Sequence, residues 1–291
     1  GIPVIGKEIF TVQGEYSANM LRKAILHEDV QLTPPAQAPN RPPILCPGCP
    51  HRSVFSVMKK LKLHGAGDIG CYTLGCAAPL NCMDSVVCMG AGFSAGMGIA
   101  KSFEKEGVTG KVVFGVVGDS TFFHSGMTGA AEIVYNKGRM IPCVLDNRIT
   151  GMTGHQDNPG TGYTLQGDPT ALLSVEKILT ALGFAPVLTV DPQDLKAMKA
   201  AVDQAVAALD AGQQPAIVTR RPCLLIKRDK FRKGMCRVNA DKCRSCRSCL
   251  KVGCPAISLE NGKAVIDRTQ CVGCTVCAQV CPFDAIEKEE K

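Results

Sequence analysis

The sequence of 291 residues has no apolar run long enough to cross a membrane. Its longest small and apolar stretch, residues 86–100, contains four glycines and is shorter than the roughly 20 residues that a transmembrane helix needs. Residues 1–10 lack the basic region, apolar run and cleavage site of a signal peptide. The sequence therefore predicts neither a membrane segment nor export, and we expect a cytoplasmic protein without a membrane partner.

The chain also has no methionine at its first position, and no fold-like pattern comes before a proline-rich run at residues 33–43. Such a run is typical of a semi-rigid spacer. We expect residues 1–40 to be the end of an upstream domain followed by this linker, although removal of an initiator methionine would leave the same first residue.

Cysteine, in contrast, is abundant, with 17 in the chain. A small secreted domain would use them as disulfides, but the two-residue spacings seen here are typical of metal ligands. Two runs near the carboxyl end each contain three cysteines at this spacing and then a Cys-Pro pair. They are Cys243-x₂-Cys246-x₂-Cys249-x₄-Cys254-Pro255 and Cys271-x₂-Cys274-x₂-Cys277-x₃-Cys281-Pro282.

This is the pattern of bacterial ferredoxins with two [4Fe–4S] clusters, in which the fourth cysteine of each run ligates the other cluster. Zinc is the alternative, because four cysteines bind it too, but zinc ribbons pair two cysteines with two. The x₄ gap in the first run departs from x₃, and we expect it to shift a potential without removing a ligand. The expected ligand sets are Cys243, Cys246, Cys249 and Cys281 for one cluster, and Cys254, Cys271, Cys274 and Cys277 for the other.

The formal net charge of +7 counts every cysteine as neutral. Thiolates that hold two clusters would lower it to about +3, since each iron–sulfide core carries less positive charge than its four thiolates carry negative charge. The basicity is therefore weak evidence, and we expect no nucleic-acid partner.

Two short apolar runs rich in β-branched residues, at 112–117 and 141–145, predict buried strands. Open α/β sheets bind ligands at the carboxyl ends of their strands, and carboxylate and amide oxygens suit Mg²⁺. Small residues there let backbone N–H groups approach a diphosphate. The residues that follow the two strands are Gly118, Asp119 and Ser120, and then Asp146 and Asn147.

An ordinary strand and turn with a surface carboxylate would explain the first of these motifs alone, whereas the pair resembles the thiamine diphosphate motif, which begins Gly-Asp-Gly and ends Asn-Asn. The chain departs from that motif at Ser120 and Asp146, neither of which is a metal ligand. The resemblance implies thiamine diphosphate and Mg²⁺, with the metal held by Asp119, Asn147 and the main-chain carbonyl of Ile149.

Strands and helices alternate through the centre of the chain. Helices are predicted at 51–63, near 99–103, and from the Asp-Pro pairs at 168–169 and 191–192, because Asp favours the N-cap and Pro the first helical position. With further strands at 187–190 and 216–219, this alternation predicts an α/β fold with a doubly wound, mainly parallel sheet. The expected domains are 1–40 (upstream tail and linker), 41–223 (thiamine diphosphate-binding), 224–235 (basic linker) and 236–291 (ferredoxin-like, α+β).

Of the eight cysteines outside the tail, four lie at the entrance to the main domain, in a turn within it and just after its last strand: Cys46, Cys49, Cys71 and Cys223. By themselves they are compatible with zinc, a redox pair or buried thiols. Together with the Gly-Asp-Ser motif and the tail, the Cys-Pro-Gly-Cys and Asp-Ile-Gly-Cys turns resemble the 2-oxoacid:ferredoxin oxidoreductases. Segments 46–52, 118–124 and 152–156 are similar to the carboxyl half of the large (alpha) subunits that act on indolepyruvate.

The resemblance implies oxidative decarboxylation of a 2-oxo acid, with an arylpyruvate such as indolepyruvate as the expected substrate and coenzyme A as co-substrate. Electrons would pass through the clusters to ferredoxin. It also implies a third [4Fe–4S] cluster on Cys46, Cys49, Cys71 and Cys223. Small buried thiols are the expectation for Cys76, Cys82 and Cys88, and Cys143 has no assigned role.

Further site residues follow from the motif segments. Met89 and Gly90 resemble the segment under the aminopyrimidine ring, Gly70 belongs to the Asp-Ile-Gly-Cys turn, and Thr153 and Gln156 resemble a ligand-facing loop. Histidine is suited to proton transfer near neutral pH, although each candidate could equally be structural. These candidates are His51, His124 and His155.

One part of a thiamine enzyme is missing, because no segment resembles the domain whose glutamate activates the pyrimidine ring. The resemblance therefore implies an upstream domain or another chain that supplies it, and a hetero-oligomer with a small beta subunit. Two other functions stay open, a non-catalytic electron-transfer module and a non-oxidative thiamine decarboxylase. Among the oxidoreductases, pyruvate, 2-oxoglutarate and branched-chain 2-oxo acids are alternative substrates.

Overall fold

The computed structural model describes residues 1–30, 37–40, 42–226 and 234–289. It divides into two units, Gly1–Pro42 and Pro43–Lys291. The first unit contains helix α1 (Ala18–Leu26), whose amino end is capped by the Ser17 hydroxyl and which buries no side chain. Part of the expected proline-rich linker and residues 227–233 of the expected basic linker lie outside the described residues.

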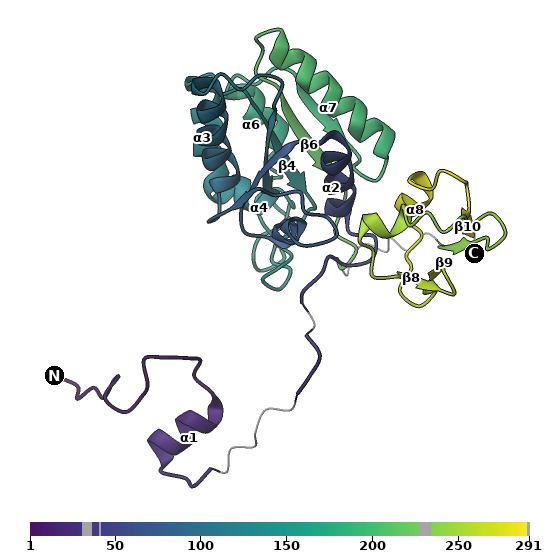
Figure 1. The fold of residues 1–291 in the computed structure, drawn as a ribbon. Coiled ribbons are helices and arrows are strands. Elements are labelled where there is room, and N and C mark those ends of the chain that lie inside the picture. Colours follow the sequence, from purple (N-terminus) through teal and green to yellow (C-terminus); the bar gives the residue numbers. More distant parts are fainter. Residues whose placement is uncertain (31–36, 41, 227–233, 290–291) are drawn as a thin grey trace. The chain divides into compact units, whose positions relative to one another are not determined.

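The second unit is built on a six-stranded sheet in the order β2-β1-β3-β4-β6-β5 (Figure 1). Every pairing in it is parallel. The strands are β1 (His64–Gly67), β2 (Ser85–Val86), β3 (Val113–Gly118), β4 (Met140–Asp146), β5 (Val187–Val190) and β6 (Ala216–Arg220). The predicted parallel α/β fold is thus confirmed, and the expected strands agree with β3 to β6 to within about two residues.

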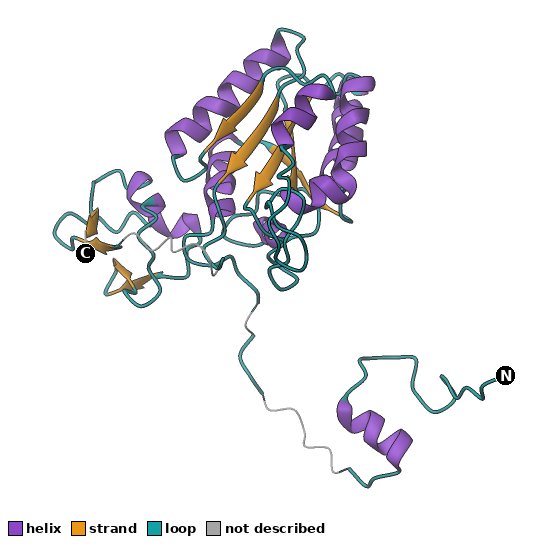
Figure 2. Ribbon diagram, turned by 180° about the vertical axis from the view of Figure 1, so that it is seen from behind, coloured by secondary structure: helices purple, strands orange, loops and turns teal. Residues whose placement is uncertain are grey.

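Helices cover both faces of the sheet (Figures 1 and 2). One apolar core joins the sheet to two helices and the other joins it to three. The first pair is α2 (Pro50–Leu61) and α7 (Leu195–Asp210), and the other three are α3 (Ala91–Lys105), α5 (Met127–Tyr135) and α6 (Val175–Ala181).

Strand β3 shows why both faces need a cover. All six of its residues are buried, and side chains alternate between the faces. Phe114 and Val116 lie in the core with α2, whereas Val113 and Val117 lie in the core with α3. Each fully buried side chain of this size contributes roughly 1.5–3 kcal/mol, so the central strand is fixed firmly and the residues at its carboxyl end are placed with it.

The prediction of a helix that begins at Asp168 is wrong. Residues 168–174 have no helix, only an isolated bridge between Pro169 and Tyr163, and α6 begins at Val175. The Ser174 hydroxyl caps it by accepting a hydrogen bond from Lys177 N at 3.2 Å. An Asp-Pro pair permits a helix start but does not require one, and here the serine cap is used instead.

The helix expected from Asp191 begins three residues later than predicted. Asp194 caps α7 by accepting from Ala197 N at 2.9 Å. Asp191 instead accepts from Gln193 N and forms an ion pair with Arg221. A tertiary partner for the first aspartate therefore moved the helix start.

The tail has two small antiparallel pairs and two short helices, in agreement with the predicted ferredoxin-like α+β domain. Its core consists largely of cysteine side chains with a few isoleucines. The pairs are β7 (Met235–Val238) with β10 (Ile286–Glu289), and β8 (Ile257–Glu260) with β9 (Lys263–Ile266); the helices are η3 (Cys249–Val252) and α8 (Val276–Gln279). Across the described residues, no helix is both long and apolar enough to span a membrane.

Candidate functional site

A cavity of about 520 Å³ opens at the carboxyl ends of β1, β3 and β4. It gathers side chains from segments that are far apart in the sequence. Of the predicted site residues, those that line it are His51, Gly70, Cys71, Met89, Gly118, Asp119, Ser120, Asn147, Ile149 and Thr153.

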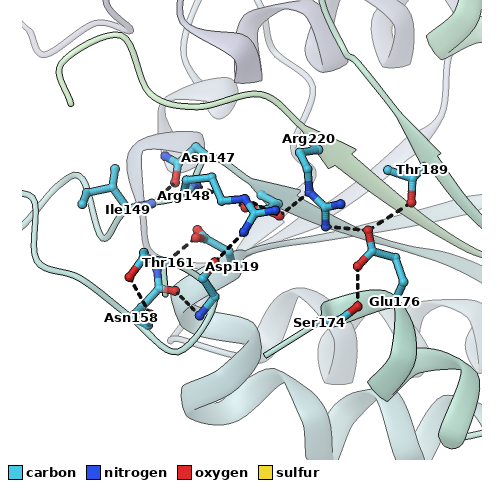
Figure 3. A network of polar contacts seen from close by, with 12 residues as sticks. Asp119, Asn147, Arg148, Ile149, Asn158, Thr161, Ser174, Glu176, Thr189 and Arg220 are labelled. Atoms are coloured by element: carbon cyan, nitrogen blue, oxygen red, sulfur yellow. Dashed lines mark hydrogen bonds and ion pairs between the residues drawn. The ribbon is translucent and has the colours of Figure 1, made fainter. Parts of the chain in front are cut away.

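Asp119 lies directly after β3 and is only 2% exposed. The Nδ2 of Asn158 donates to its Oδ2 at 2.9 Å (Figure 3). Burial, together with the negative charge of Asp146, raises the pKa of Asp119 to about 7. A buried carboxylate is costly unless it is paired or binds a metal, so this position favours a cation.

Asn147 follows β4, and both the oxygen and the nitrogen of its side-chain amide make contacts that orient it. Ile149 N donates to Asn147 Oδ1 at 3.2 Å, and Asn147 Nδ2 lies 3.3 Å from His51 Nε2. Burial lowers the pKa of His51 to about 4, so its ring is neutral near pH 7. Its Nε2 then accepts the amide hydrogen and its Nδ1 carries the proton. The second lone pair of Asn147 Oδ1 stays available for a metal.

Asp146, which departs from the thiamine diphosphate motif, is paired with two arginines. Arg220 Nε contacts its Oδ2 at 2.8 Å and Arg148 Nε lies 3.4 Å from the same oxygen. Arg220 also pairs with Glu176, which in turn accepts from the hydroxyls of Ser174 and Thr189 (Figure 3). The carboxylate is thus part of a network that extends away from the cavity, and its charge is balanced locally.

Asp68 is a residue that the sequence reasoning missed. It is fully buried, and its carboxylate accepts from Gly90 N at 2.8 Å, from Gly92 N at 3.3 Å and from the Tyr72 hydroxyl. These bonds fix the start of α3 beside the cavity. The signal was present as an aspartate between a short apolar stretch and the glycine of the Cys71 turn, but nothing local pointed to a partner 22 residues away.

Gly90 and Gln156 were predicted in the site but do not line the cavity. Gly90 has φ +93°, and an added Cβ would lie 2.8 Å from Ser125 Oγ. Gln156 hydrogen-bonds with Thr153 within the same loop. His124 and His155 are exposed and also lie outside the lining, so the structure brings His51 alone of the three predicted histidines to the cavity.

The four body cysteines expected to hold a third cluster, Cys46, Cys49, Cys71 and Cys223, lie close enough to influence each other's charge. Burial raises the pKa of the Cys71 thiol, and the charges of Cys223 and Cys46 raise it further. Burial also raises the pKa of Cys49 to about 12, with smaller contributions from Cys46 and Cys71. Cys223 N donates to Asn147 O at 2.8 Å, which ties this set to the carboxyl end of β4.

The remaining body cysteines differ from expectation. Cys82 is buried, as predicted, and so is Cys143. Cys76 and Cys88 are exposed, so the expectation of small buried thiols is wrong for these two. Cys76 ends a short 3-10 helix (Cys71–Cys76), and Cys88 lies between β2 and α3.

In the tail, each expected ligand set lines a cavity of its own, of about 360 Å³ and 280 Å³. Cys236 contributes to the second cavity as well. In the chain as far as the structure describes it, no three His, Cys, Asp or Glu side chains group around one point as the ligands of a single metal ion would. The cavity linings are Cys243, Cys246, Cys249 and Cys281 in the first, and Cys254, Cys271, Cys274 and Cys277 in the second.

Comparisons with known proteins match both parts of the chain. Residues 68–219 match the family of the thiamine pyrophosphate enzyme, C-terminal TPP binding domain, and residues 264–287 match the 4Fe-4S binding domain. The indolepyruvate oxidoreductase subunit IorA of Pyrococcus abyssi is 40% identical over 269 residues, which cover 86% of this chain and 41% of that protein.

The IorA subunit of Methanothermobacter marburgensis is 35% identical over 294 residues, covering 95% of this chain and 46% of the relative. The chain therefore spans less than half the length of these relatives. A 2-oxoglutarate:ferredoxin oxidoreductase from Magnetococcus marinus gives a TM-score of 0.48 at 19% identity, over 65% of this chain and 66% of that one.

Proposed function

Since this chain belongs to the thiamine pyrophosphate enzymes through their C-terminal TPP binding domain, we propose that it forms the cofactor-binding and electron-accepting part of a 2-oxoacid:ferredoxin oxidoreductase. The observation that carries the proposal is the position of Cys71. It lines the cavity with Asp119 and Asn147, and it interacts with the cysteines at 46 and 223. One residue is therefore shared by the candidate cofactor site and a candidate cluster site.

The residues of the cavity fit a magnesium-bound diphosphate. The donor set would be Asp119 Oδ, Asn147 Oδ1 and the Ile149 carbonyl, all hard oxygens. Gly118 has no room for a side chain, because a Cβ there would lie 2.8 Å from the Tyr72 ring. A small residue at this point leaves the backbone N–H groups open to a phosphate.

Thiamine diphosphate, when bound, supplies the electron sink for the carbanion left by loss of CO₂. The chain's residues bind and orient it. His51 is a poor proton donor at neutral pH with a pKa of about 4, so we assign it the positioning of Asn147. Met89 and Thr153 line the cavity next to these groups.

The three cysteine sets fit iron–sulfur clusters. Each tail set lines a cavity, and the cysteines of the body set are close enough to influence one another's charge. Two would be in the tail and the third on Cys46, Cys49, Cys71 and Cys223. We propose that ferredoxin receives the electrons and that coenzyme A receives the acyl group. The name of the relatives supports an arylpyruvate such as indolepyruvate as the substrate.

The assembly we propose is a cytoplasmic hetero-oligomer. The pyrimidine-activating domain would come from the part of the relatives that this chain does not span or from another chain, and a small beta subunit would complete the complex. The rim of the cavity is consistent with such a cover, since Ile69, Met89 and Met152 each remain at least 40% exposed.

A ferredoxin-reduction assay of the reconstituted complex across 2-oxo acids tests the proposal. We expect reduction that requires Mg²⁺, thiamine diphosphate and coenzyme A, is fastest with an arylpyruvate, and is lost in Asp119→Asn. Decarboxylation without ferredoxin reduction would indicate a non-oxidative decarboxylase. Failure to bind thiamine diphosphate, with the clusters intact, would indicate a pure electron-transfer module.

A further inference from the structure

Arg52 connects the body of the molecule to its tail. It lies in the first turn of α2 and is 3% exposed. Its Nη2 donates to the carbonyl oxygens of Leu45 and Cys46, the latter at 3.1 Å. Its Nη1 donates to the carbonyl oxygens of Val252, at 3.1 Å, and Gly253. One guanidinium therefore bridges two segments about 200 residues apart in the sequence.

All four acceptors of Arg52 are neutral. Among the residues that the structure describes, no carboxylate lies within ion-pair distance of it, and its buried Nε has no hydrogen-bond partner. A buried cation without a counter-charge is strongly destabilising. The protein part alone thus leaves this charge uncompensated.

The backbone groups that accept from the guanidinium belong to or adjoin cysteines of two ligand sets. The guanidinium donates to the carbonyl of Cys46 and to the carbonyl of Gly253, which comes directly before Cys254. Pro47 and Gly48, between the first two cysteines, line the tail cavity that contains Cys254.

Neutral contacts hold the same boundary in place. Gln193 Nε2 donates to Gly48 O at 2.8 Å, and Gln279 Nε2 donates to Gln193 O at 2.7 Å. An added Cβ at Gly48 would lie 2.3 Å from Val272 Cγ2, so the turn and the tail are in close contact. The position of the tail therefore does not depend on the arginine charge alone.

We propose that Arg52 is the counter-cation shared by two clusters, one on Cys46, Cys49, Cys71 and Cys223 and one on Cys254, Cys271, Cys274 and Cys277. The four thiolates around each cluster core leave the cluster with net negative charge. One-electron reduction adds one more negative charge, whereas the positive charge of the guanidinium does not change. The nearby positive charge stabilises the reduced form. Arg52 therefore raises both reduction potentials, as a positioning residue that acts on the clusters without ligating them.

This inference rests on the proposed cluster ligation, and redox titration of the full chain followed by electron paramagnetic resonance tests it. Arg52→Gln should lower the reduction potential of each of the two flanking clusters by about 59 mV, which corresponds to about a tenfold change in the one-electron equilibrium constant. The cluster on Cys243, Cys246, Cys249 and Cys281 should shift less, because no residue of segment 45–52 lines its cavity. Arg52→Lys keeps the positive charge, so the potentials of this variant should stay close to those of the unmodified chain.

Two control variants separate charge from docking. Gln279→Leu removes two neutral hydrogen bonds across the boundary, and Arg139→Gln removes a half-buried arginine that pairs with Asp210 away from the cysteines. Both should leave all potentials unchanged. Equal shifts in Arg52→Gln and Gln279→Leu, or no shift in Arg52→Gln, would overturn the inference.

If Arg52→Gln does not retain its clusters, the reduction potentials of Arg52→Lys test the inference instead. A potential close to that of the unmodified chain, with faster proteolysis at the boundary, supports the charge role. A fall of about 59 mV in the reduction potentials of the flanking clusters of Arg52→Lys contradicts it. Purified chain with no bound iron or sulfide would instead refute the proposed clusters themselves, so the two failures are distinguishable.

Discussion

The body and the tail place their candidate ligands in opposite ways. In the body, oxygen donors lie at the ends of β3 and β4, and the strands are held by two large apolar cores that contain none of those donors. In the tail, the cysteines expected to bind clusters are themselves a large part of the core. The comparison indicates that the body would fold before it binds its cofactor, whereas the tail would depend on its clusters for stability.

The largest effect is expected from a cluster ligand in the tail core. Cys277→Ser should remove one cluster and unfold the tail almost completely, because Cys277 is buried in its core. Hydrogen exchange should show lost protection in β7 to β10 and intact protection in β3 and β4. Cys76→Ser, at an exposed cysteine outside every ligand set, is the control and should change nothing. Loss of protection in the body as well would contradict the comparison.

Asp119→Asn should separate binding from stability in the body. It should abolish Mg²⁺-dependent binding of thiamine diphosphate. Without the cofactor, burial raises the pKa of this carboxyl in the folded chain to about 7, whereas an exposed aspartate has a pKa of about 4. The folded chain therefore holds a proton that the unfolded chain has lost, and stability falls as the pH rises from about 4 to about 7.

The same substitution should therefore stabilise the cofactor-free chain at pH 8, by an amount on the order of 4 kcal/mol at most, and should have almost no effect at pH 4. Chemical denaturation at the two pH values, with clusters intact and without Mg²⁺, measures the difference. An equal effect at both pH values would show that Asp119 is not a buried carboxyl with a raised pKa.

Asn158→Ala tests how the metal ligand is oriented. Asn158 donates to Asp119 Oδ2, and loss of such a supporting hydrogen bond weakens metal binding by about 10–100-fold. Titration calorimetry of Mg²⁺ with thiamine diphosphate should show this loss with little change in unfolding. Asn136→Ala, at an exposed helix end, is the matched control. Unchanged affinity in Asn158→Ala would remove Asn158 from the site.

A glycine that caps α3, Gly90, and one within it, Gly98, give the smallest effect and an internal control. Gly90 has φ +93° and a close contact to Ser125, so Gly90→Ala should cost about 1–3 kcal/mol. An added Cβ at Gly98 meets no atom within 4 Å, and Gly98→Ala should stabilise the helix by up to about 1 kcal/mol. Thermal unfolding distinguishes them, and equal effects would contradict the close approach at Gly90.

The sequence predicted those features that depend on local pattern. Continuous apolar runs rich in β-branched residues predicted β3 and β4, because burial on both faces requires such composition. Spacing grouped the tail cysteines, whose two sets each line a cavity. The helix starts were less accurate, since Asp191 found a partner in Arg221 and α6 was capped by Ser174.

Features made by long-range contact could not be predicted. Asp68 binds Gly90 N from another segment, and Arg52 binds carbonyl oxygens about 200 residues away. Burial lowers the pKa of His51 to about 4, and burial is not readable from a motif. Such residues become visible only when the fold brings their partners together.

Manganese in place of magnesium tests the central claim most directly, because its paramagnetism reports both its ligands and a nearby reduced cluster. In the assembled complex, we predict that Mn²⁺ binds only with thiamine diphosphate, is released in Asp119→Asn, and relaxes faster when the clusters are reduced. Manganese that stays free at saturating thiamine diphosphate, or a relaxation rate that does not depend on cluster reduction, would contradict a metal–diphosphate site next to cysteine-held iron.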